Sequence, residues 1–226
     1  FKTILTSHID LEKTIRSKSS GFVYILLKGL IPFFYQRANS LVAVSKGAAR
    51  GLKKDFGITK KINIVYNGIA INKPFKKRKL PKTKIILSVG RLSEQKDHLT
   101  LIKAVKQACF RFPDIKLLIP SDGPLKKELQ KYVKKNNLSG KVKFLGWVKS
   151  LEGLYDKSDL FVLSTKREGF GYVLVEAMAA SPPVISSDVD YGPREILDKG
   201  KFGIMVPAGN VRGLTTAISR IFSNHK

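Results

Sequence analysis

The sequence predicts an α/β fold in which parallel strands alternate with helices. Short apolar runs recur along the chain, and some of them, such as Leu160–Leu163, contain no polar residue. Longer segments with helical periodicity separate these runs. Strands that are apolar on both sides are typical of parallel sheets covered by helices on both faces. Apolar residues make up 43% of the 226 residues, which is enough for a core of this kind.

Predicted strands and helices follow one another along most of the chain. Strands are expected at Leu41–Val44, Ile62–Tyr66, Lys84–Val89, Ile115–Ile119, Val142–Leu145, Leu160–Leu163, Val184–Ser186 and Ile204–Val206. Helices are expected near residues 46–56, 98–111, 124–136, 150–157, 172–180 and 210–222. The opening residues Phe1–Thr6 also have the pattern of a buried strand, and because the chain begins with Phe we expect a fragment of a longer protein.

The longest apolar stretch is Gly21–Tyr35. It is too short for a membrane-spanning helix, and it also contains Lys28 and is interrupted by Pro32. Two alternatives stay open for it, a buried helix and a helix that lies on a membrane surface.

The formal net charge of +25 is the most unusual bulk property of the chain. Lysines spread over the whole length carry most of it, and such a field attracts nucleic acid, anionic lipid or phosphorylated sugars. The sequence lacks the arginine-rich, aromatic-interleaved strands that are typical of a dedicated nucleic-acid reader. A nucleic-acid-binding protein is therefore an alternative that only the charge supports, and no specific nucleic acid is expected as a partner.

The single cysteine, Cys109, excludes an internal disulfide. It lies in a helical pattern, where we expect a buried small apolar side chain in a reducing compartment. The three histidines are scattered and nothing near Cys109 has metal-ligand spacing, so no structural zinc site is predicted.

One segment breaks the alternation of strands and helices. Residues 73–82 contain two prolines and a run of basic residues without periodicity, which predicts a linker between a partial domain, 1–72, and a fuller one, 83–226. The charge run has two interpretations, a solvated surface and a contact with anionic lipid or phosphate.

Two loops carry signals for phosphate binding. In the first, Gly90 ends a strand, and Arg91 and Lys96 precede the next helix. Ligands of doubly wound sheets bind at the carboxyl ends of strands, where the planar fork of an arginine and the mobile charge of a lysine suit a diphosphate. The alternative is an ordinary basic loop in a basic protein.

The second loop follows the strand Leu160–Leu163 and includes Gly169 and Gly171. Two glycines let the backbone approach a ligand closely, and the free N–H groups of the following helix favour an anion. Glu168 lies in the loop and Glu176 about one turn into the helix, so separate contacts to two polyhydroxyl groups fit them better than an acid–base pair. The alternative is a glycine turn with two solvated acids.

Several smaller features have both structural and functional interpretations. Ser45 is expected to cap the helix near Lys46, and Asn210 the last helix. Ser121–Pro124 has the pattern of a turn with proline at a helix start. Further candidates are His8 after the first strand, the turn Asn67–Gly68 and the loop Ser187–Glu195.

In order, these motifs resemble family 4 of the retaining glycosyltransferases, which have two facing Rossmann-like domains (the GT-B fold). Glu168 and Glu176 have seven residues between them, the signature spacing of that family. Tyr191–Leu197 is similar to members that build bacterial lipopolysaccharide, capsule or lipid-linked glycans. The other matching blocks cover nearly the whole chain: Leu41–Ser45, Val65–Ile69, Ser88–Leu92 with Lys96, Phe144–Gly146, Phe161–Ser164 and Pro183–Asp188.

The resemblance implies a C-terminal part of an acceptor-side domain in 1–72 and a nearly complete donor-binding domain in 83–226. The expected donor is a nucleoside diphosphate sugar linked to UDP or GDP, and the expected acceptor is a glycan or a lipid-linked glycan. No cofactor and no metal are expected, because no Asp-x-Asp motif is evident. The expected location is cytoplasmic, peripheral on the inner face of an anionic membrane.

The resemblance also implies roles for matching residues. Arg91 and Lys96, next to Gly90, bind the donor diphosphate and stabilise its departure. Glu176 holds the ribose and Glu168 holds sugar hydroxyls. Catalytic roles fall to Arg91, Lys96, Glu168 and His8, the last of which contacts the transferred sugar; the remaining donor-binding positions are Gly169, Phe170, Gly171 and Tyr172.

The chain departs from the family pattern in ways that leave alternatives open. Ser121 and Ser181 stand near positions where glycine is usual, which predicts strained turns. The first part of the acceptor domain and the final helices of the family are not represented, so the fragment itself is compatible with donor binding without transfer. The alternatives are an inactive donor-domain fragment, a basic polyanion-binding module and a sugar-phosphate epimerase on the same fold.

Overall fold

The structure is a computed structural model that describes residues 2–8, 11–69 and 84–223. The chain divides into two compact units. The first unit is Phe1–Gly68 together with Arg167–Gly171 and Asp190–Glu195, and the second is Ile69–Lys166, Tyr172–Val189 and Ile196–Lys226. The linker expected at 73–82 lies outside the described residues, and the domain boundary there stays a prediction.

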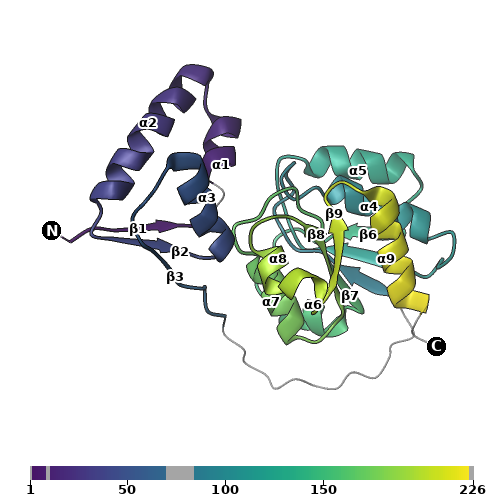
Figure 1. The fold of residues 1–226 in the computed structure, drawn as a ribbon. Coiled ribbons are helices and arrows are strands. Elements are labelled where there is room, and N and C mark those ends of the chain that lie inside the picture. The colour runs from purple at the N-terminus through teal and green to yellow at the C-terminus, as the bar shows by residue number, and fades with distance from the viewer. Residues whose placement is uncertain (1, 9–10, 70–83, 224–226) are drawn as a thin grey trace. The chain divides into compact units, whose positions relative to one another are not determined.

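The first unit contains a parallel sheet in the order β1-β2-β3, drawn in purple and blue in Figure 1. In its register Leu5 lies opposite Leu41, and Leu41 opposite Ile62. Its strands are β1 (Ile4–Ser7), β2 (Ser40–Ala43) and β3 (Ile62–Ile64), and its helices are α1 (Leu11–Lys18), α2 (Gly21–Arg37) and α3 (Lys46–Phe56).

The core of the first unit lies between the sheet and its helices. Leu41 of β2 packs there with Leu52 and Phe56 of α3 and with Ile58, all of them buried. Helix α3 has the predicted bounds because both of its ends are capped. The Ser45 hydroxyl accepts a hydrogen bond from the Ala48 N–H at 3.0 Å, and Gly57 ends the helix with φ 61°. The predicted cap at Ser45 is confirmed.

Helix α2 runs without interruption from Gly21 to Arg37, through Pro32, and none of its residues is buried. Of the two alternatives for this segment, the buried helix does not hold in this structure. Proline removes one backbone hydrogen bond, and the packing of Ile31 and Tyr35 against the core of the unit holds the helix on both sides of it. Among the helices of the described residues, none has the length and apolar character needed to cross a membrane.

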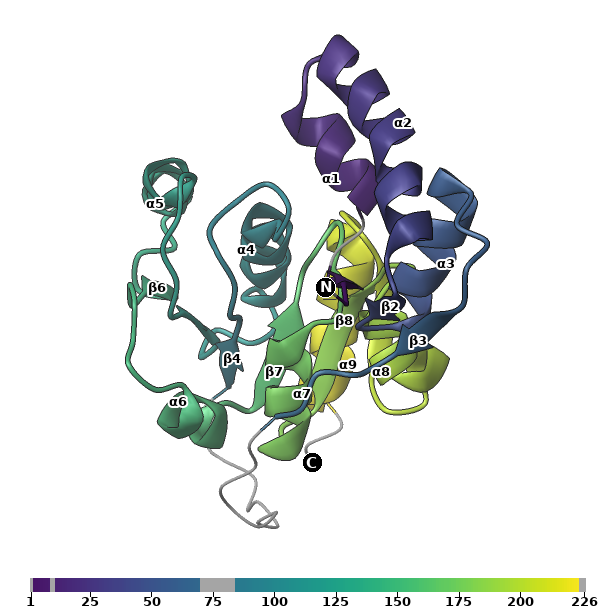
Figure 2. The same ribbon diagram turned by 90° about the vertical axis from the view of Figure 1, so that its left-hand side faces the viewer.

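The second unit contains a six-stranded, fully parallel sheet in the order β6-β5-β4-β7-β8-β9 (Figures 1 and 2). The predicted α/β class with parallel strands is confirmed. The strands are β4 (Ile85–Leu87), β5 (Lys116–Ile119), β6 (Val142–Phe144), β7 (Leu160–Leu163), β8 (Val184–Asp188) and β9 (Ile204–Pro207).

Helices cover both faces of this sheet, with α4 and α5 on one side and α6 and α7 on the other (Figure 2). Helices α4 (His98–Ala108), α5 (Lys126–Lys135) and α9 (Val211–Ser223) contribute to one buried cluster, and α6 (Glu152–Lys157) and α7 (Tyr172–Ala179) to a second. Neighbouring residues of one strand point to opposite clusters: Ile86 joins the first cluster and Leu87 the second. The apolar strands are therefore buried on both faces, as predicted.

Some boundaries differ from the prediction. Helix α4 ends at Ala108 instead of residue 111, and α5 starts at Lys126, two residues after Pro124. The segment expected as a loop at Ser187–Glu195 includes the start of a short helix, α8 (Pro193–Ile196), which is followed by the 3₁₀ turn η1 (Asp198–Gly200). One helical turn is too short to show an apolar period, so the pattern could not reveal α8.

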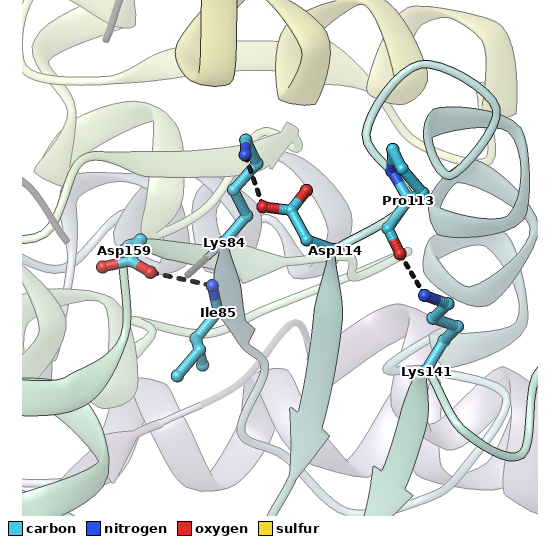
Figure 3. A network of polar contacts seen from close by, with 6 residues as sticks. All are labelled: Lys84, Ile85, Pro113, Asp114, Lys141 and Asp159. Atoms are coloured by element: carbon cyan, nitrogen blue, oxygen red, sulfur yellow. Dashed lines mark hydrogen bonds and ion pairs between the residues drawn. The ribbon is translucent and has the colours of Figure 1, made fainter. Parts of the chain in front are cut away.

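Polar contacts tie together the amino ends of the neighbouring strands β6, β5, β4 and β7 (Figure 3). Lys84, before β4, forms an ion pair with Asp114, before β5, at 2.6 Å. The Ile85 N–H donates to the carboxylate of Asp159 at 2.8 Å, and the ammonium of Lys141 donates to the carbonyl of Pro113. These contacts fix the amino ends of the strands. Ligands of parallel α/β sheets bind at the opposite edge, in the loops at the carboxyl ends of the strands.

Candidate functional site

The loop between β4 and α4 holds three predicted residues, Gly90, Arg91 and Lys96. The Gly90 N–H donates to the Ser121 hydroxyl at 3.1 Å, which joins the loops after β4 and β5. The aliphatic chain of Lys96 lies over Gly90, since a Cβ atom placed there would be 3.2 Å from Lys96 Cδ. Arg91 is exposed and Lys96 half-buried, so the loop presents two cationic side chains within six residues.

A second loop holds the first in place. The Leu92 N–H donates to the Asp122 carbonyl at 2.9 Å, and the Leu125 N–H donates to the Leu92 carbonyl at 3.0 Å. Gly123 lies so close to this backbone that a Cβ atom there would be 2.5 Å from the Leu92 oxygen. The turn Ser121–Pro124, predicted as structural, therefore supports the candidate phosphate loop.

The end of β7 is joined to the same loop. The hydroxyls of Ser164 and Thr165 donate to the carbonyls of Lys96, at 3.2 Å, and Gln95, at 3.1 Å. The Thr165 N–H donates in turn to the hydroxyl of Ser187, in β8, at 3.0 Å. Hydroxyl groups thus connect the carboxyl ends of β4, β7 and β8 and hold the Arg91–Lys96 loop against the sheet.

A buried histidine lies directly behind this loop. His98 is the first residue of α4 and is 2% exposed. Burial, and after it the positive charge of Lys96, lowers the pKa of His98 to about 4. His98 is therefore neutral at pH 7 and adds no charge beside the two cations.

The glycine-rich loop Glu168–Gly171 clusters with the first unit. The Glu168 carboxylate accepts a hydrogen bond from the Gly169 N–H at 3.2 Å, and Gly171 has φ 100°, which favours glycine. The backbone at Gly192 packs directly against this loop. A Cβ atom at Gly192 would be 2.0 Å from the Phe170 carbonyl oxygen. Only glycine fits at position 192, and this contact fixes the backbone of Phe170.

Helix α7 begins at Tyr172, immediately after that loop, and carries Glu176 in its second turn, as predicted. The phenol of Tyr155, on α6, donates a hydrogen bond to Glu176 Oε2 at 2.8 Å. Glu176 is half-buried and Tyr155 is 4% exposed. Desolvation, and after it the negative charge of Glu176, raises the pKa of Tyr155, so this phenol stays protonated and donates.

The predicted residues fall into two sets. Gly90, Arg91, Lys96, Tyr172 and Glu176 belong to the second unit, at the carboxyl edge of its sheet. His8, which is exposed at the end of β1, belongs to the first unit together with Glu168, Gly169, Phe170 and Gly171.

The sequence patterns did not reveal Tyr155 and Thr165, and they placed Ser121 and Ser187 in candidate loops without showing the supporting role of their hydroxyls. A hydroxyl residue directly after an apolar strand was the only signal available, and it applies to Ser164 and Thr165. Tyr155 had no signal, because a tyrosine on an amphipathic helix has the pattern of a core residue.

The described residues also form an open hollow of about 430 Å³ between the edge strand β9 and helix α9. Arg212, Thr216 and Arg220 line it, beside Met205 and Val206. None of the predicted site residues lines this hollow, so it is separate from the candidate site, and its two arginines serve below as a control for charge alone.

Comparison with known proteins identifies the family of both parts of the chain. The sequence profile of "Glycosyl transferases group 1" matches residues 70–226, and that of "Glycosyltransferase Family 4" matches residues 1–73. The loops of the candidate site that lie after β4 and β7 fall in the first match, and His8 falls in the second.

Several relatives have names that describe a reaction or a pathway. The chain is 31% identical over 229 residues to the Campylobacter jejuni N-acetylgalactosamine-N,N'-diacetylbacillosaminyl-diphospho-undecaprenol 4-alpha-N-acetylgalactosaminyltransferase, covering 100% of this chain and 62% of that protein. It is 33% identical over 141 residues to the Rhizobium meliloti lipopolysaccharide core biosynthesis glycosyltransferase LpsE, covering 62% of this chain and 40% of that protein. The chain thus spans less than two thirds of the length of these relatives.

Solved structures share the fold. Anabaena Alr3699/HepE in complex with UDP superimposes with a TM-score of 0.82 at 21% identity, covering 99% of this chain and 63% of that chain. A mutant of Staphylococcus aureus TarM in complex with fondaparinux, alpha-GlcNAc-glycerol and UDP superimposes with a TM-score of 0.79 at 20% identity, covering 88% of this chain and 40% of that chain. These similarities confirm the predicted GT-B fold class.

Proposed function

Because this chain belongs to the family of group 1 glycosyl transferases, we propose that it carries the donor site of a retaining glycosyltransferase. The enzyme moves a sugar from a nucleoside diphosphate sugar, linked to UDP or GDP, to a glycan or lipid-linked acceptor. The observation that carries the proposal is the loop Gly90–Lys96, which carries two cationic side chains and whose backbone is fixed by hydrogen bonds at the carboxyl edge of a parallel sheet.

In this proposal Arg91 and Lys96 bind the donor diphosphate. Arginine offers paired N–H donors to two phosphate oxygens and lysine a mobile charge, and the positive dipole end of α7 favours an anion as well. As the sugar–phosphate bond breaks, negative charge grows on the leaving phosphate. The two cations beside the leaving phosphate stabilise this charge.

The other donor-site residues contact the sugar and the ribose. Glu176 accepts hydrogen bonds from the ribose hydroxyls, and Glu168 from hydroxyls of the transferred sugar. The backbone N–H groups of Phe170, Gly171 and Tyr172, with Gly169 beside them, approach the sugar and the phosphates. His8 contacts the transferred sugar.

The reaction proceeds with retention of configuration. The acceptor hydroxyl attacks the oxocarbenium-like carbon from the face that the leaving phosphate vacates, and the phosphate takes the proton of that hydroxyl. The protein needs no paired carboxylates of the glycosidase kind. Protein cations do the work of a metal here, so we expect EDTA to leave donor binding unchanged.

The acceptor is part of a bacterial cell-surface polysaccharide pathway in this proposal. Two relatives support it, because one is named for transfer to a diphospho-undecaprenol glycan and the other for lipopolysaccharide core biosynthesis. The reaction then takes place on the cytoplasmic side of the membrane.

We place the protein at an anionic membrane surface, and helix α2 supports this. Phe22 is 79% exposed and Ile25 70%, on a helix without buried residues in a chain of net charge +25. An apolar face on a basic protein is suited to lipid with anionic headgroups.

Sedimentation with vesicles tests the membrane proposal. At low salt we expect phosphatidylglycerol vesicles to sediment the chain, phosphatidylcholine vesicles to do so weakly, and Phe22→Ser/Ile25→Ser to reduce sedimentation. Phe110→Ser is the control, because Phe110 of the second unit is an apolar side chain that is even more exposed (88%). If anionic vesicles do not sediment the wild-type chain, the membrane proposal is wrong.

Calorimetric titration with UDP and GDP at moderate salt tests the donor site. We expect one nucleotide to bind, and Arg91→Ala/Lys96→Ala to weaken it by about 100-fold or more, since each lost charge-assisted bond contributes about 1.5–3 kcal/mol. Arg212→Ala/Arg220→Ala removes the same charge from the hollow at β9 and should leave affinity unchanged. Equal losses in both variants would mean binding by charge alone, as in a polyanion-binding module. No binding by the folded wild-type chain would favour an inactive fragment.

A further inference from the structure

We propose that Tyr155 is a positioning residue that fixes the carboxylate of Glu176 and so makes the site selective for ribonucleotides. This inference rests on the proposed function, because it assumes that Glu176 faces the donor ribose. The observation behind it is the hydrogen bond of 2.8 Å from the Tyr155 hydroxyl to Glu176 Oε2, between two residues on different helices.

The core holds the tyrosine firmly in this place. Its ring lies 5.8 Å from the ring of Phe161, which is fully buried in β7, at an interplanar angle of 50°. Leu174 and Ala177, on the inner face of α7, belong to the same buried cluster. The Ser158 hydroxyl donates to the Tyr155 carbonyl at 3.0 Å and ends the helix there. The phenol oxygen therefore occupies a fixed point beside α7.

The phenol has a single proton and two acceptors within reach. Glu176 Oε2 is at 2.8 Å and the carbonyl of Val173 at 3.4 Å. The carboxylate is both closer and charged, and charged acceptors form the shorter and stronger bonds, so the proton lies toward Glu176. The raised pKa of Tyr155 keeps this proton in place throughout the neutral and mildly alkaline range.

The consequence concerns the second oxygen of Glu176. A glutamate on a helix surface has three rotatable torsions and samples several rotamers. With Oε2 held by a rigid buried donor, Oε1 keeps one position and acts as a preformed acceptor for a hydroxyl. A vicinal diol such as that of a ribose suits this acceptor, whereas a nucleotide without the 2′ and 3′ hydroxyls gains nothing from it.

Calorimetry with paired nucleotides tests this role. The probes are the ribonucleoside diphosphate that the wild-type chain binds and its 2′,3′-dideoxy analogue. We expect the wild-type chain to prefer the ribonucleotide, and Tyr155→Phe to weaken ribonucleotide binding by about 10-fold while the dideoxy analogue binds unchanged. In a chain that already carries Glu176→Gln, Tyr155→Phe should have little further effect, since the two residues act as one unit.

The matched control is Tyr132→Phe, which removes a phenol oxygen from the half-buried tyrosine of α5 in the same unit. Thermal melting checks that each variant is folded. If Tyr155→Phe keeps the wild-type preference for the ribonucleotide, or weakens both nucleotides equally, the positioning role is wrong although donor binding stands. If the folded wild-type chain binds no nucleotide, the proposed function fails and this inference fails with it.

Discussion

The hydroxyl of Ser121 accepts a hydrogen bond from the backbone N–H of Gly90 at 3.1 Å, and this contact joins the loops that follow β4 and β5. Ser121 is buried, and its φ is not among the positive values of the described residues. The strain expected for a serine near this usual glycine position is therefore absent, and the hydroxyl supports the candidate phosphate loop.

Replacement of Ser121 tests that support. Ser121→Ala leaves the Gly90 N–H without its acceptor, so we expect a loss of about 1 kcal/mol in the free energy of unfolding and a several-fold loss of nucleotide affinity. Urea unfolding and calorimetry measure the two effects. Ser223→Ala is the control, since the Ser223 hydroxyl is buried with no partner among the described residues, and it should be neutral. Equal stability of the two variants would contradict the assignment.

Gly90→Ala should weaken both the fold and nucleotide binding. The new methyl group would lie 3.2 Å from Lys96 Cδ, so the lysine side chain has to move by a few tenths of an ångström. We expect a several-fold loss of affinity in calorimetry and a lower melting temperature, because Gly90 has φ 154°, where alanine is strained. Gly153→Ala is the control, because nothing lies within 4 Å of a Cβ atom at that position of α6. Unchanged affinity in Gly90→Ala would mean that the position of Lys96 does not matter for binding.

The free energy of unfolding should decrease as the pH is lowered through the range in which His98 takes up a proton only in the unfolded chain. The folded-state pKa is about 4 and the ordinary value 6.5, so between these two the unfolded chain binds a proton that the folded chain does not. The free energy of unfolding therefore falls by up to about 3 kcal/mol as the pH drops through this window, and does not change above it on account of His98.

Urea unfolding at pH 7 and pH 4.5 measures this effect, with His98→Asn as the variant that cannot titrate. Asp114 and Asp122, whose pKa values are lowered by hydrogen bonds to Lys84 and Lys126, contribute at lower pH. Their stabilisation is present above their ordinary pKa and is lost only as the pH falls through the lowered values. An equal pH dependence in wild type and His98→Asn would exclude His98 as the cause.

Ser181→Gly should stabilise the chain. Ser181 has φ 72°, in the left-handed region, so the strain predicted for a serine near a usual glycine position is confirmed here. The gain is about 1 kcal/mol or less, because relief of the strain is partly offset by the greater freedom of glycine in the unfolded chain. Thermal melting measures it. Ser219→Gly, inside helix α9, should have the opposite sign; a loss of stability in both variants would contradict the explanation.

Much of the fold was predictable because its signals are local. The bounds of α3 followed from a serine before the helix and a glycine after it, and those of β7 from four successive apolar residues. Ser187–Glu195 lacked such a signal, and α8 was taken for a loop. The exposure of α2 was also beyond local reasoning, since an apolar helix has the same sequence whether or not a partner covers it.

The candidate site was predictable where one loop carries the whole motif, as in Gly90–Lys96. It was not predictable where the partner comes from another element. Tyr155 and Glu176 are 21 positions apart, and the Ser121–Gly90 contact spans 31. Only the packing of two helices and the pairing of two strands bring these groups together.

The strand order of the second unit has a consequence for how the chain reaches its native state. Strand β4 lies between β5 and β7, and β7 is made only after the whole of β5, α5, β6 and α6. During synthesis on the ribosome, β4 therefore leaves the exit tunnel long before its second neighbour exists, with one hydrogen-bonding edge unfilled. Pairing at such sequence separation is slow, and the exposed nascent edge is where a chaperone that recognises apolar extended segments is expected to act.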